Sequence, residues 1–291
     1  MKLISFMRNA KPSYGIVSGQ GDNLRVLDLQ PILGDRAPDL RSLIAQNMTG
    51  AAADALKANP ATLNFADLEL LPVIPNPDKI LCVGLNYKDH LAETGRASTE
   101  MPAIFLRVPS SQVAHGQPIL RPPESHRLDY ECEIAVVIGP VAGQSGRRIQ
   151  EADAWAHVAG YSCYNDGSIR DWQNHTTQWT AGKNYWRTGG FGPWMVTADE
   201  IKPGQQLTVS TRLNGVELQK SHTGLMIHSI PKLIAYISSF TPLLPGDVIV
   251  TGTPSGVGLA RKPPLWMKDG DVCEVEIEGI GILLSPIVDE K

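Results

Sequence analysis

Three carboxylates at alternating positions open a strand-like segment near the middle of the chain. Asp129, Glu131 and Glu133 are followed by an apolar run that ends at Ile138. Because successive side chains of a strand point to opposite faces, we expect the three acids on one face, with neighbours roughly 7 Å apart. Carboxylates crowded at the edge of a core repel one another, so one of them holds a proton or a cation lies between them.

A bound cation is the interpretation that we favour. Oxygen ligands without a histidine or cysteine cluster suit a hard ion, Mg²⁺ or Mn²⁺, rather than zinc. This segment alone leaves a second interpretation open, since an acidic strand start can simply be solvated or paired with Arg127.

A histidine and a glutamate three residues apart occupy a short segment upstream. Asn86 can cap a helix that ends before Gly95, which predicts about two turns over residues 87–94. His90 and Glu93 would then be neighbours on one helix face. A carboxylate beside an imidazole fixes its tautomer and raises its basicity, as a general base requires. Such pairs are also common as exposed helix decoration, so the pair alone does not establish a catalytic role.

Two further segments place polar side chains where strands end. Asp166 follows a strand-like run over 160–165, and a turn or capping role is its simpler interpretation. The strand over 247–251 runs into a glycine-rich loop that ends at Gly258. Such a loop exposes backbone N–H groups and the Thr253 hydroxyl to an anion such as a carboxylate. The loop matches neither a P-loop nor a dinucleotide-binding fingerprint.

The elements that must position these residues lie in two predicted domains. A small N-terminal domain over 1–72 combines short strands at 3–6, 14–17 and 24–27 with a helix at about 40–58. A proline-rich joint over 71–77 separates it from a larger domain over 73–291. That domain is expected to be mostly β, with strands at 79–84, 134–138, 207–213, 247–251 and 273–277. Its predicted helices cover 86–93, 150–158 and 231–240.

Composition excludes several classes of function. Lys and Arg total 26 against 30 Asp and Glu, a net charge of −4, which indicates no basic face for nucleic acid. No apolar run approaches the about 18 residues that span a bilayer, and the start of the chain lacks a signal-peptide pattern. A cytoplasmic protein is therefore expected, without membrane or nucleic-acid partners. The four cysteines are widely spaced and indicate reduced, mostly buried thiols.

Taken together, these segments resemble the fumarylacetoacetate hydrolase family over about residues 79 to 288. The motifs that carry the resemblance are Val83-Gly84-Leu85-Asn86-Tyr87 with His90 and Glu93, Asp129-Tyr130-Glu131-Cys132-Glu133, Asn165-Asp166 with Arg170-Asp171-Trp172-Gln173, Gly192-Pro193-Trp194, Pro245-Gly246-Asp247 and Thr251-Gly252-Thr253-Pro254-Ser255-Gly256-Val257-Gly258. The resemblance implies an α+β, mostly β fold. In that fold a mixed β-sandwich roll, like the family's C-terminal domain, follows a small N-terminal α+β domain.

The resemblance also implies the composition of a site. It implies a divalent metal, Mg²⁺ or Mn²⁺, whose ligands are Glu131, Glu133 and Asp166, and it makes Asp129 a supporting acid. It implies a dyad of His90 and Glu93 that activates water, with Lys183 facing the substrate. The residues expected to contact the substrate are Thr253, Tyr87, Arg107 and Gln173. A homodimer is implied as well.

Two departures from the family pattern leave the substrate open. Arg107 stands where we expect lysine, and Trp186 stands where aspartate often follows the segment that begins at Lys183. Arginine keeps the charge but changes the geometry of its contacts. The loop over 95–102, directly after the dyad, is either a lid over the site or an ordinary surface connection.

The predicted reaction is hydrolysis of a C–C bond in an acylpyruvate-like 1,3-diketo acid, as in the catabolism of aromatic or sugar acids. Three carboxylates leave open positions on the ion for the carboxylate and keto oxygen of a 2-oxo acid, so that the ion acts as an electron sink. Water deprotonated by His90 would attack the distal carbonyl, with Lys183 stabilising the oxyanion.

Other functions remain open at this point. The same electron sink would serve an oxaloacetate-type decarboxylase, or a hydratase or isomerase of 2-oxo acids. A protein that binds metal or ligand without catalysis is the alternative from a different class. A glycosidase is rejected, because its two carboxylates must flank the scissile bond, whereas Glu131 and Glu133 share one strand face. A serine hydrolase is disfavoured because the chain has no G-x-S-x-G motif.

Overall fold

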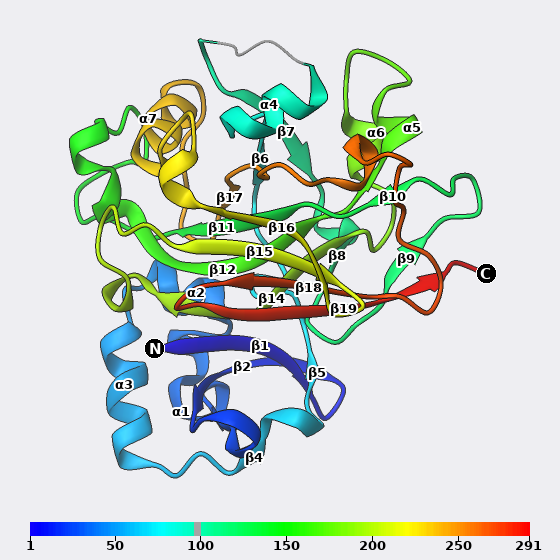
Figure 1. Ribbon diagram of the computed structural model, residues 1–291. Helices are drawn as coiled ribbons and strands as arrows, with labels where there is room; N and C mark the ends of the chain where they lie inside the picture. The colour runs from blue at the N-terminus through cyan, green and yellow to red at the C-terminus, as the bar shows by residue number, and fades with distance from the viewer. Residues whose placement is uncertain (96–99) are drawn as a thin grey trace.

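The computed structural model describes residues 1–95 and 100–291. The centre of the predicted lid, 96–99, lies outside the described residues. The fold is α+β and mostly β, as predicted. A large mixed sheet runs through the molecule in the order β4-β3-β2-β1-β14-β12-β11-β17-β6-β7, with β5 beside β1 and β8 beside β14 (Figure 1). Its strands are β1 (Lys2–Arg8), β2 (Lys11–Ser18), β3 (Arg25–Asp28), β4 (Leu63–Asn64), β5 (Glu69–Leu70), β6 (Ile80–Gly84), β7 (Ala103–Arg107), β8 (Gln112–Val113), β11 (Cys132–Ile138), β12 (Val158–Asp166), β14 (Gly189–Thr197) and β17 (Val248–Val250).

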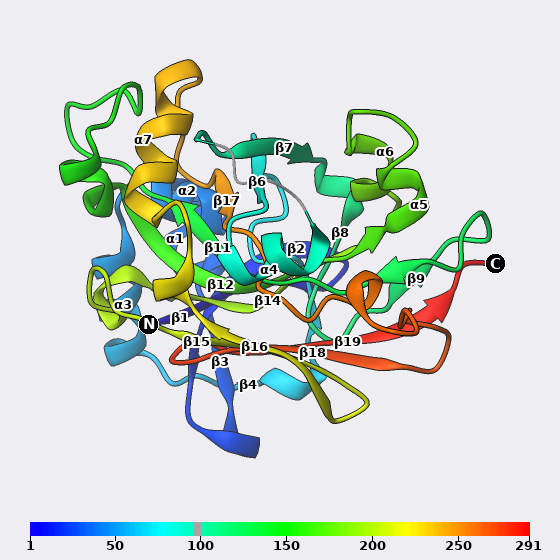
Figure 2. The ribbon, with the colours of Figure 1, turned by 45° about the horizontal axis from the view of Figure 1, so that its top comes forward.

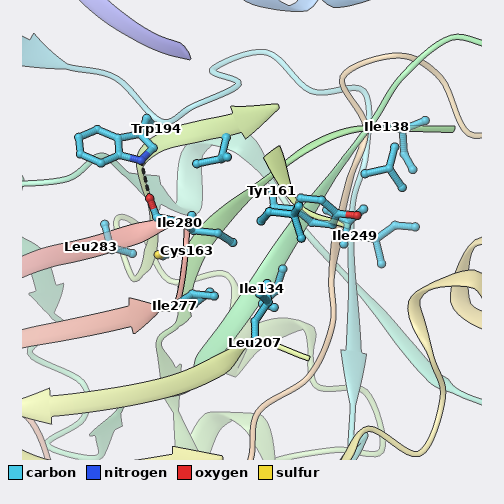
Figure 3. Packing of buried hydrophobic residues seen from close by; sticks show 14 of the residues in the cluster. Ile134, Ile138, Tyr161, Cys163, Trp194, Leu207, Ile249, Ile277, Ile280 and Leu283 are labelled. Carbon is cyan, nitrogen blue, oxygen red and sulfur yellow. Dashed lines mark hydrogen bonds between the residues drawn. The ribbon is translucent and has the colours of Figure 1, made fainter. Parts of the chain in front are cut away.

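A second sheet packs against the large one. Its order is β16-β15-β18-β19-β9, and a third, two-stranded sheet pairs β10 with β13. The strands are β9 (Ile119–Arg121), β10 (Leu128–Asp129), β13 (Ser168–Ile169), β15 (Thr208–Leu213), β16 (Val216–His222), β18 (Val272–Ile277) and β19 (Gly281–Asp289). Figure 3 shows Ile277 and Leu283 from this sheet beside Cys163 and Trp194 from the large sheet. The Trp194 indole N–H is satisfied within this core, because it donates to the Ile280 carbonyl at 2.6 Å.

Short helices lie on both sides of the large sheet. They are α1 (Gln30–Leu33), α2 (Leu40–Ala45), α3 (Thr49–Ala58), α4 (Lys88–Thr94), α5 (Arg170–Gln173), α6 (Thr180–Lys183) and α7 (Ile230–Phe240). Figure 1 places α4, α5 and α6 on the side away from the N-terminal strands β1 and β2, and Figure 2 shows the same molecule with its top turned forward. In the described part of the chain, none of the helices has the length and apolarity needed to cross a membrane.

The N-terminal strands are continuous with the rest of the large sheet. Strand β1 pairs antiparallel with β14, with Lys2 opposite Val196 and Leu3 opposite Met195. The residues before and after the predicted boundary at 72/73 therefore share one sheet. The division into domains over 1–72 and 73–291 is kept as a proposal about folding units.

Four local predictions need correction. The helix expected over 40–58 is two helices, because Asn47 adopts a positive φ of 52° between them. The segment expected to be helical over 150–158 is a 3₁₀ turn over Glu151–His157. Tyr87, not Asn86, caps α4. The Asn86 amide instead donates to the carbonyls of Thr251 and His228, at 2.7 and 3.0 Å.

The fourth correction concerns the acidic strand itself. It is interrupted after Asp129 and resumes at Cys132, so that Tyr130 and Glu131 connect β10 to β11. Beyond this break, every residue of β11 is buried, as the apolar run predicts. All four cysteines are free and buried, which confirms that prediction.

Candidate metal centre and active site

Three of the predicted acids converge where β11 and β12 lie side by side. The antiparallel register pairs Cys132 with Asn165, so Asp166 at the end of β12 lies opposite Glu131. The Asp166 amide donates to the Glu131 carbonyl at 3.0 Å. One carboxylate oxygen from each of Glu131, Glu133 and Asp166 lies within 4.8 Å of the others, and all three residues are buried. The structure thus brings the three expected metal ligands together.

Three buried cations surround two of these carboxylates. The Lys183 ammonium at the end of α6 lies 2.6 Å from both Glu131 Oε2 and Asp166 Oδ2. Arg170 Nη1 lies 2.6 Å from Glu131 Oε1, and Arg107 Nη1 lies 2.6 Å from Asp166 Oδ1. Burial by itself raises the pKa of Glu131, but the charges of Arg170 and Lys183 outweigh it and lower that pKa to about 2. Glu131 is therefore a carboxylate anion at neutral pH.

Glu133 has a different environment. Within the described residues no cation forms an ion pair with it, and its Oε2 accepts a hydrogen bond from the Gly252 amide. Burial, and then the charges of Asp166 and Glu131, raise the pKa of Glu133 well above its usual value. A divalent cation beside Glu133 would offset that cost, and three carboxylates form an oxygen-only donor set. The residues present therefore fit a hard divalent ion.

Asp129 does not join this cluster, contrary to the expectation that three acids share one face. Because the strand breaks after it, its carboxylate points to the glycine-rich loop and accepts from the amides of Gly258 and Leu259 at 2.7 and 2.9 Å. Its Oδ2 also lies 2.7 Å from Arg170 Nε. Asp129 thus holds the guanidinium that pairs with Glu131.

The histidine and glutamate of α4 form the expected pair. His90 Nδ1 lies 2.7 Å from Glu93 Oε1, and Glu93 Oε2 accepts from the Gly256 amide at 2.9 Å. A proton on Nδ1 satisfies the Glu93 carboxylate, which leaves Nε2 as the basic nitrogen of the imidazole. The carboxylate is itself held at both oxygens, so the orientation of the ring is fixed.

These residues line one cavity of about 260 Å³. Its polar wall contains His90, Glu93, Glu131, Glu133, Asp166, Arg170, Gln173, Lys183 and Thr253. An apolar wall contains Val83, Phe105, Trp179, Val257, Leu259 and Ala260. The Trp179 indole packs directly on Gly84, where any Cβ would lie 2.2 Å from a ring carbon. A cavity of this size, lined by both charged and apolar side chains, suits a small organic acid.

The predicted substrate contacts divide into two groups. Gln173 and Thr253 line the cavity. Tyr87 and Arg107 do not line it, so this structure does not support a direct substrate contact for either residue. Tyr87 is buried and forms a β-bridge with Met226, and Arg107 is fully buried behind Asp166.

The glycine-rich loop also differs from the prediction of an anion-binding loop. The amides of Gly252, Gly256 and Gly258 donate to Glu133, Glu93 and Asp129, respectively. The loop therefore binds the protein's own carboxylates. The Thr253 hydroxyl accepts from Gln219 Nε2 at 2.9 Å, and Thr253 lines the cavity together with Val257 of the same loop.

Sequence reasoning missed the structural role of Arg170 and the aromatic wall. Arg170 stands in a recognised motif, but a single arginine after a strand carries no signal that it will be buried between two acids. Gly84 gives the local indication that a side chain packs here, because a glycine at the end of a buried strand can mark a place where another group comes close to the backbone. Nothing in the sequence indicates which side chain approaches it.

The fold and site define a class of protein: a β-rich protein with a cluster of three carboxylates that could hold a hard cation, and an imidazole–carboxylate pair, at one small cavity. The family model described as fumarylacetoacetate (FAA) hydrolase C-terminal matches residues 79–288. The chain belongs to the fumarylacetoacetate hydrolase family.

Individual relatives extend this likeness to the N-terminal residues. The chain is 38% identical to the Xenopus laevis protein named oxaloacetate tautomerase fahd2, mitochondrial, over 99% of this chain and 90% of the relative. A crystal structure of a putative HpcE protein from Mycobacterium smegmatis has a TM-score of 0.85 and 31% identity, with both chains covered completely. The maleylpyruvate hydrolase from Sphingobium sp. SYK-6, in complex with manganese(II) and pyruvate, has a TM-score of 0.81 and 27% identity over the whole of both chains.

Proposed function

We propose that this protein is a divalent-metal-dependent enzyme that forms the enolate of a 2-oxo acid, and that it catalyses keto–enol tautomerisation of an oxaloacetate-like acid. The observation that carries the proposal is the placement of three carboxylates and the His90–Glu93 pair on the wall of one small cavity. The tautomerase relatives, which match 99% of the chain, support the choice of reaction.

Each part of the site has a role in this proposal. Glu131, Glu133 and Asp166 would hold Mg²⁺ or Mn²⁺, and the ion when bound would bind the acid through its carboxylate and keto oxygen and stabilise the enolate. His90 Nε2 would take the proton from C3 of the keto form and give a proton to the enolate oxygen, which yields the enol, and the reverse sequence would regenerate the keto form. Glu93 would stabilise the imidazolium between these two transfers. Lys183 provides a buried ammonium beside the ligands, where it would stabilise negative charge on oxygen.

Hydrolysis of an acylpyruvate-like 1,3-diketo acid is the second candidate. The fixed orientation of the His90 ring favours it, since the same nitrogen could deprotonate a water that attacks the distal carbonyl. The hydrolase neighbour crystallised with manganese and pyruvate also supports it. Decarboxylation of oxaloacetate, and hydration or isomerisation of a 2-oxo acid, would use the same enolate. Binding without catalysis is the alternative outside this group.

The reactions differ in what happens to the ultraviolet absorbance of the enol and in the products. We expect the protein loaded with Mg²⁺ or Mn²⁺ to accelerate equilibration of the oxaloacetate enol without releasing carbon dioxide, and EDTA to abolish the effect. Cleavage of acetylpyruvate to acetate and pyruvate would instead favour the hydrolase, and carbon dioxide release the decarboxylase. A metal-loaded protein that changes neither compound would favour the non-catalytic alternative.

Three further predictions rest on the sequence and the family resemblance alone: the homodimer, the cytoplasmic location and the choice between Mg²⁺ and Mn²⁺. The mass of the protein in solution tests the homodimer. The metal content after purification without added metal tests the choice between Mg²⁺ and Mn²⁺. Fractionation of the source cells tests the cytoplasmic location, since the tautomerase relatives are named as mitochondrial proteins.

A further inference from the structure

Arg107 lies behind the candidate metal centre and does not contact the cavity. Its side chain is completely buried, and Nη1 donates to Asp166 Oδ1 at 2.6 Å and to the Gly167 carbonyl at 3.0 Å. Nη2 donates to the Thr188 hydroxyl at 2.8 Å. The guanidinium therefore links the Asp166 carboxylate, an expected metal ligand, to the Gly167 carbonyl and the Thr188 hydroxyl.

The guanidinium has room because residue 189 is glycine. In the pairing of β12 with β14, Gly189 lies directly opposite Asp166. A Cβ at Gly189 would lie 2.8 Å from Arg107 Nη2 and 2.8 Å from Gln112 Oε1. Arg107 thus lies beside Gly189, in space that the side chain of any other residue would need.

The remaining oxygen of Asp166 is also held, because Oδ2 lies 2.6 Å from the Lys183 ammonium. Two cations on two different oxygens fix both the rotation and the tilt of this carboxylate. Each oxygen keeps a second lone pair for a metal ion. Mutation of groups that orient metal ligands in this way typically lowers metal affinity by about 10- to 100-fold.

We propose that Arg107 is a positioning residue for the metal centre: it orients the Asp166 carboxylate for a divalent cation, and it can do so only because residue 189 is glycine. The inference rests on the proposed metal centre, but not on the reaction assigned to it. Lysine at 107 would keep the charge, but its single ammonium lacks the planar fork that reaches Asp166 and Thr188 together.

The test measures Mn²⁺ affinity of the metal-free protein by the electron paramagnetic resonance signal of free Mn²⁺, without substrate. We expect Arg107→Lys and Gly189→Ala each to weaken Mn²⁺ binding about 10- to 100-fold, as is typical for groups that orient metal ligands. If the new methyl group acts on Asp166 through Nη2, the double variant should bind about as weakly as Arg107→Lys alone, because lysine has no Nη2. Such non-additivity is the signature of one shared contact. The methyl group also meets Gln112 Oε1, and a double variant weaker than Arg107→Lys would assign that part of the loss to Gln112.

Arg121→Lys is the matched control. Arg121 forms a two-bond contact with Asp289 near the surface, at 2.6 and 2.7 Å, in a different sheet. The Arg121→Lys variant also replaces a guanidinium by an ammonium, but at a distance from the proposed metal centre. Its Mn²⁺ affinity should therefore equal that of the wild type. Circular dichroism and the melting temperature of each metal-free variant separate folding from affinity.

The outcomes are distinguishable. Wild-type protein that does not bind Mn²⁺ overturns the metal centre and this inference together. Wild-type binding that is unchanged in folded Arg107→Lys and Gly189→Ala overturns the inference alone, whatever happens to the melting temperature. Should both variants fail to fold, Thr188→Val removes the acceptor of Nη2 together with the hydrogen bond of that hydroxyl to the Tyr185 carbonyl. Unchanged Mn²⁺ affinity in that variant overturns the inference.

Discussion

Ser255 Oγ donates a hydrogen bond of 2.7 Å to Asp89 Oδ2 and so ties the glycine-rich loop to helix α4. The Gly256 amide makes a parallel contact with Glu93. Residues 163 to 166 positions apart along the chain thus hold the imidazole–carboxylate pair from one side. The position of His90 over the cavity depends on the loop as well as on the helix that carries it.

Ser255→Ala tests this dependence. Loss of one hydrogen bond to a carboxylate should cost about 1 kcal/mol in transition-state stabilisation, or about a fivefold fall in kcat. The metal ligands do not contact Ser255, so Mn²⁺ affinity should stay at its wild-type value. Steady-state kinetics and metal titration on the same preparation give both numbers. Ser239→Ala, which removes a hydroxyl bonded within α7, should change neither.

His90→Asn should separate proton transfer from metal binding. The imidazole belongs to the cavity wall but not to the carboxylate cluster, and general-base groups contribute about 10²- to 10⁴-fold to rates. We expect kcat to fall within that range for both enol equilibration and diketo acid cleavage, while Mn²⁺ affinity changes less than twofold. Full activity in His90→Asn would remove the dyad from the mechanism and leave a reaction driven by the metal alone.

The predicted and observed sites agree where chemistry depends on local spacing, and they differ where it depends on distant segments. The spacing of Glu131 and Glu133 indicates a carboxylate cluster, whereas only the family resemblance assigns Asp166 to it, because its own segment favours a turn or capping role. The separate environment of Asp129 was not predictable, because a two-residue break in a strand leaves no clear pattern in composition. The position of Arg107 depends on Gly189, some eighty residues away, and only the pairing of β12 with β14 brings them together.

Acidification should destabilise the protein partly through His115. This imidazole accepts a hydrogen bond at Nδ1 from the Leu284 amide at 3.1 Å, and burial lowers its pKa below the usual 6.5. At a pH between the two pKa values, His115 therefore binds a proton in the unfolded chain but not in the folded chain. The contribution of His115 to stability is complete well above pH 6.5 and is lost as pH falls below that value, toward the lower pKa of the folded state.

Urea unfolding of metal-free protein between pH 8 and pH 5 measures this effect. The wild type should lose stability over that range as the unfolded chain takes up a proton at His115. His115→Asn keeps an acceptor near the Nδ1 position but does not titrate, so its curve should be flatter. The exposed His126→Asn is the control and should follow the wild type. Parallel curves for wild type and His115→Asn would contradict the assignment.

Replacing either glutamate of the proposed metal centre by the neutral glutamine should change the stability of the metal-free protein, in opposite directions for Glu131 and Glu133. Glu133 has no cationic partner among the described residues, and its pKa is raised by burial and by its acidic neighbours. Above pH 4.5 its ionisation therefore costs the metal-free fold some stability. Glu133→Gln keeps an acceptor for the Gly252 amide and removes the titratable group, so the metal-free protein should become more stable.

Glu131→Gln should instead destabilise the metal-free protein by about 3 kcal/mol, because Arg170 and Lys183 would lose the carboxylate that neutralises them in the interior. Both substitutions remove an expected ligand, so both should weaken Mn²⁺ binding severely. Urea unfolding in EDTA measures the change in the free energy of unfolding for each variant, which should be opposite in sign. Mn²⁺ titration measures the loss of Mn²⁺ affinity expected of both. If Glu133→Gln lowered stability as Glu131→Gln does, Glu133 would have a compensating partner in the folded protein, and a metal ion would not be needed to offset its charge.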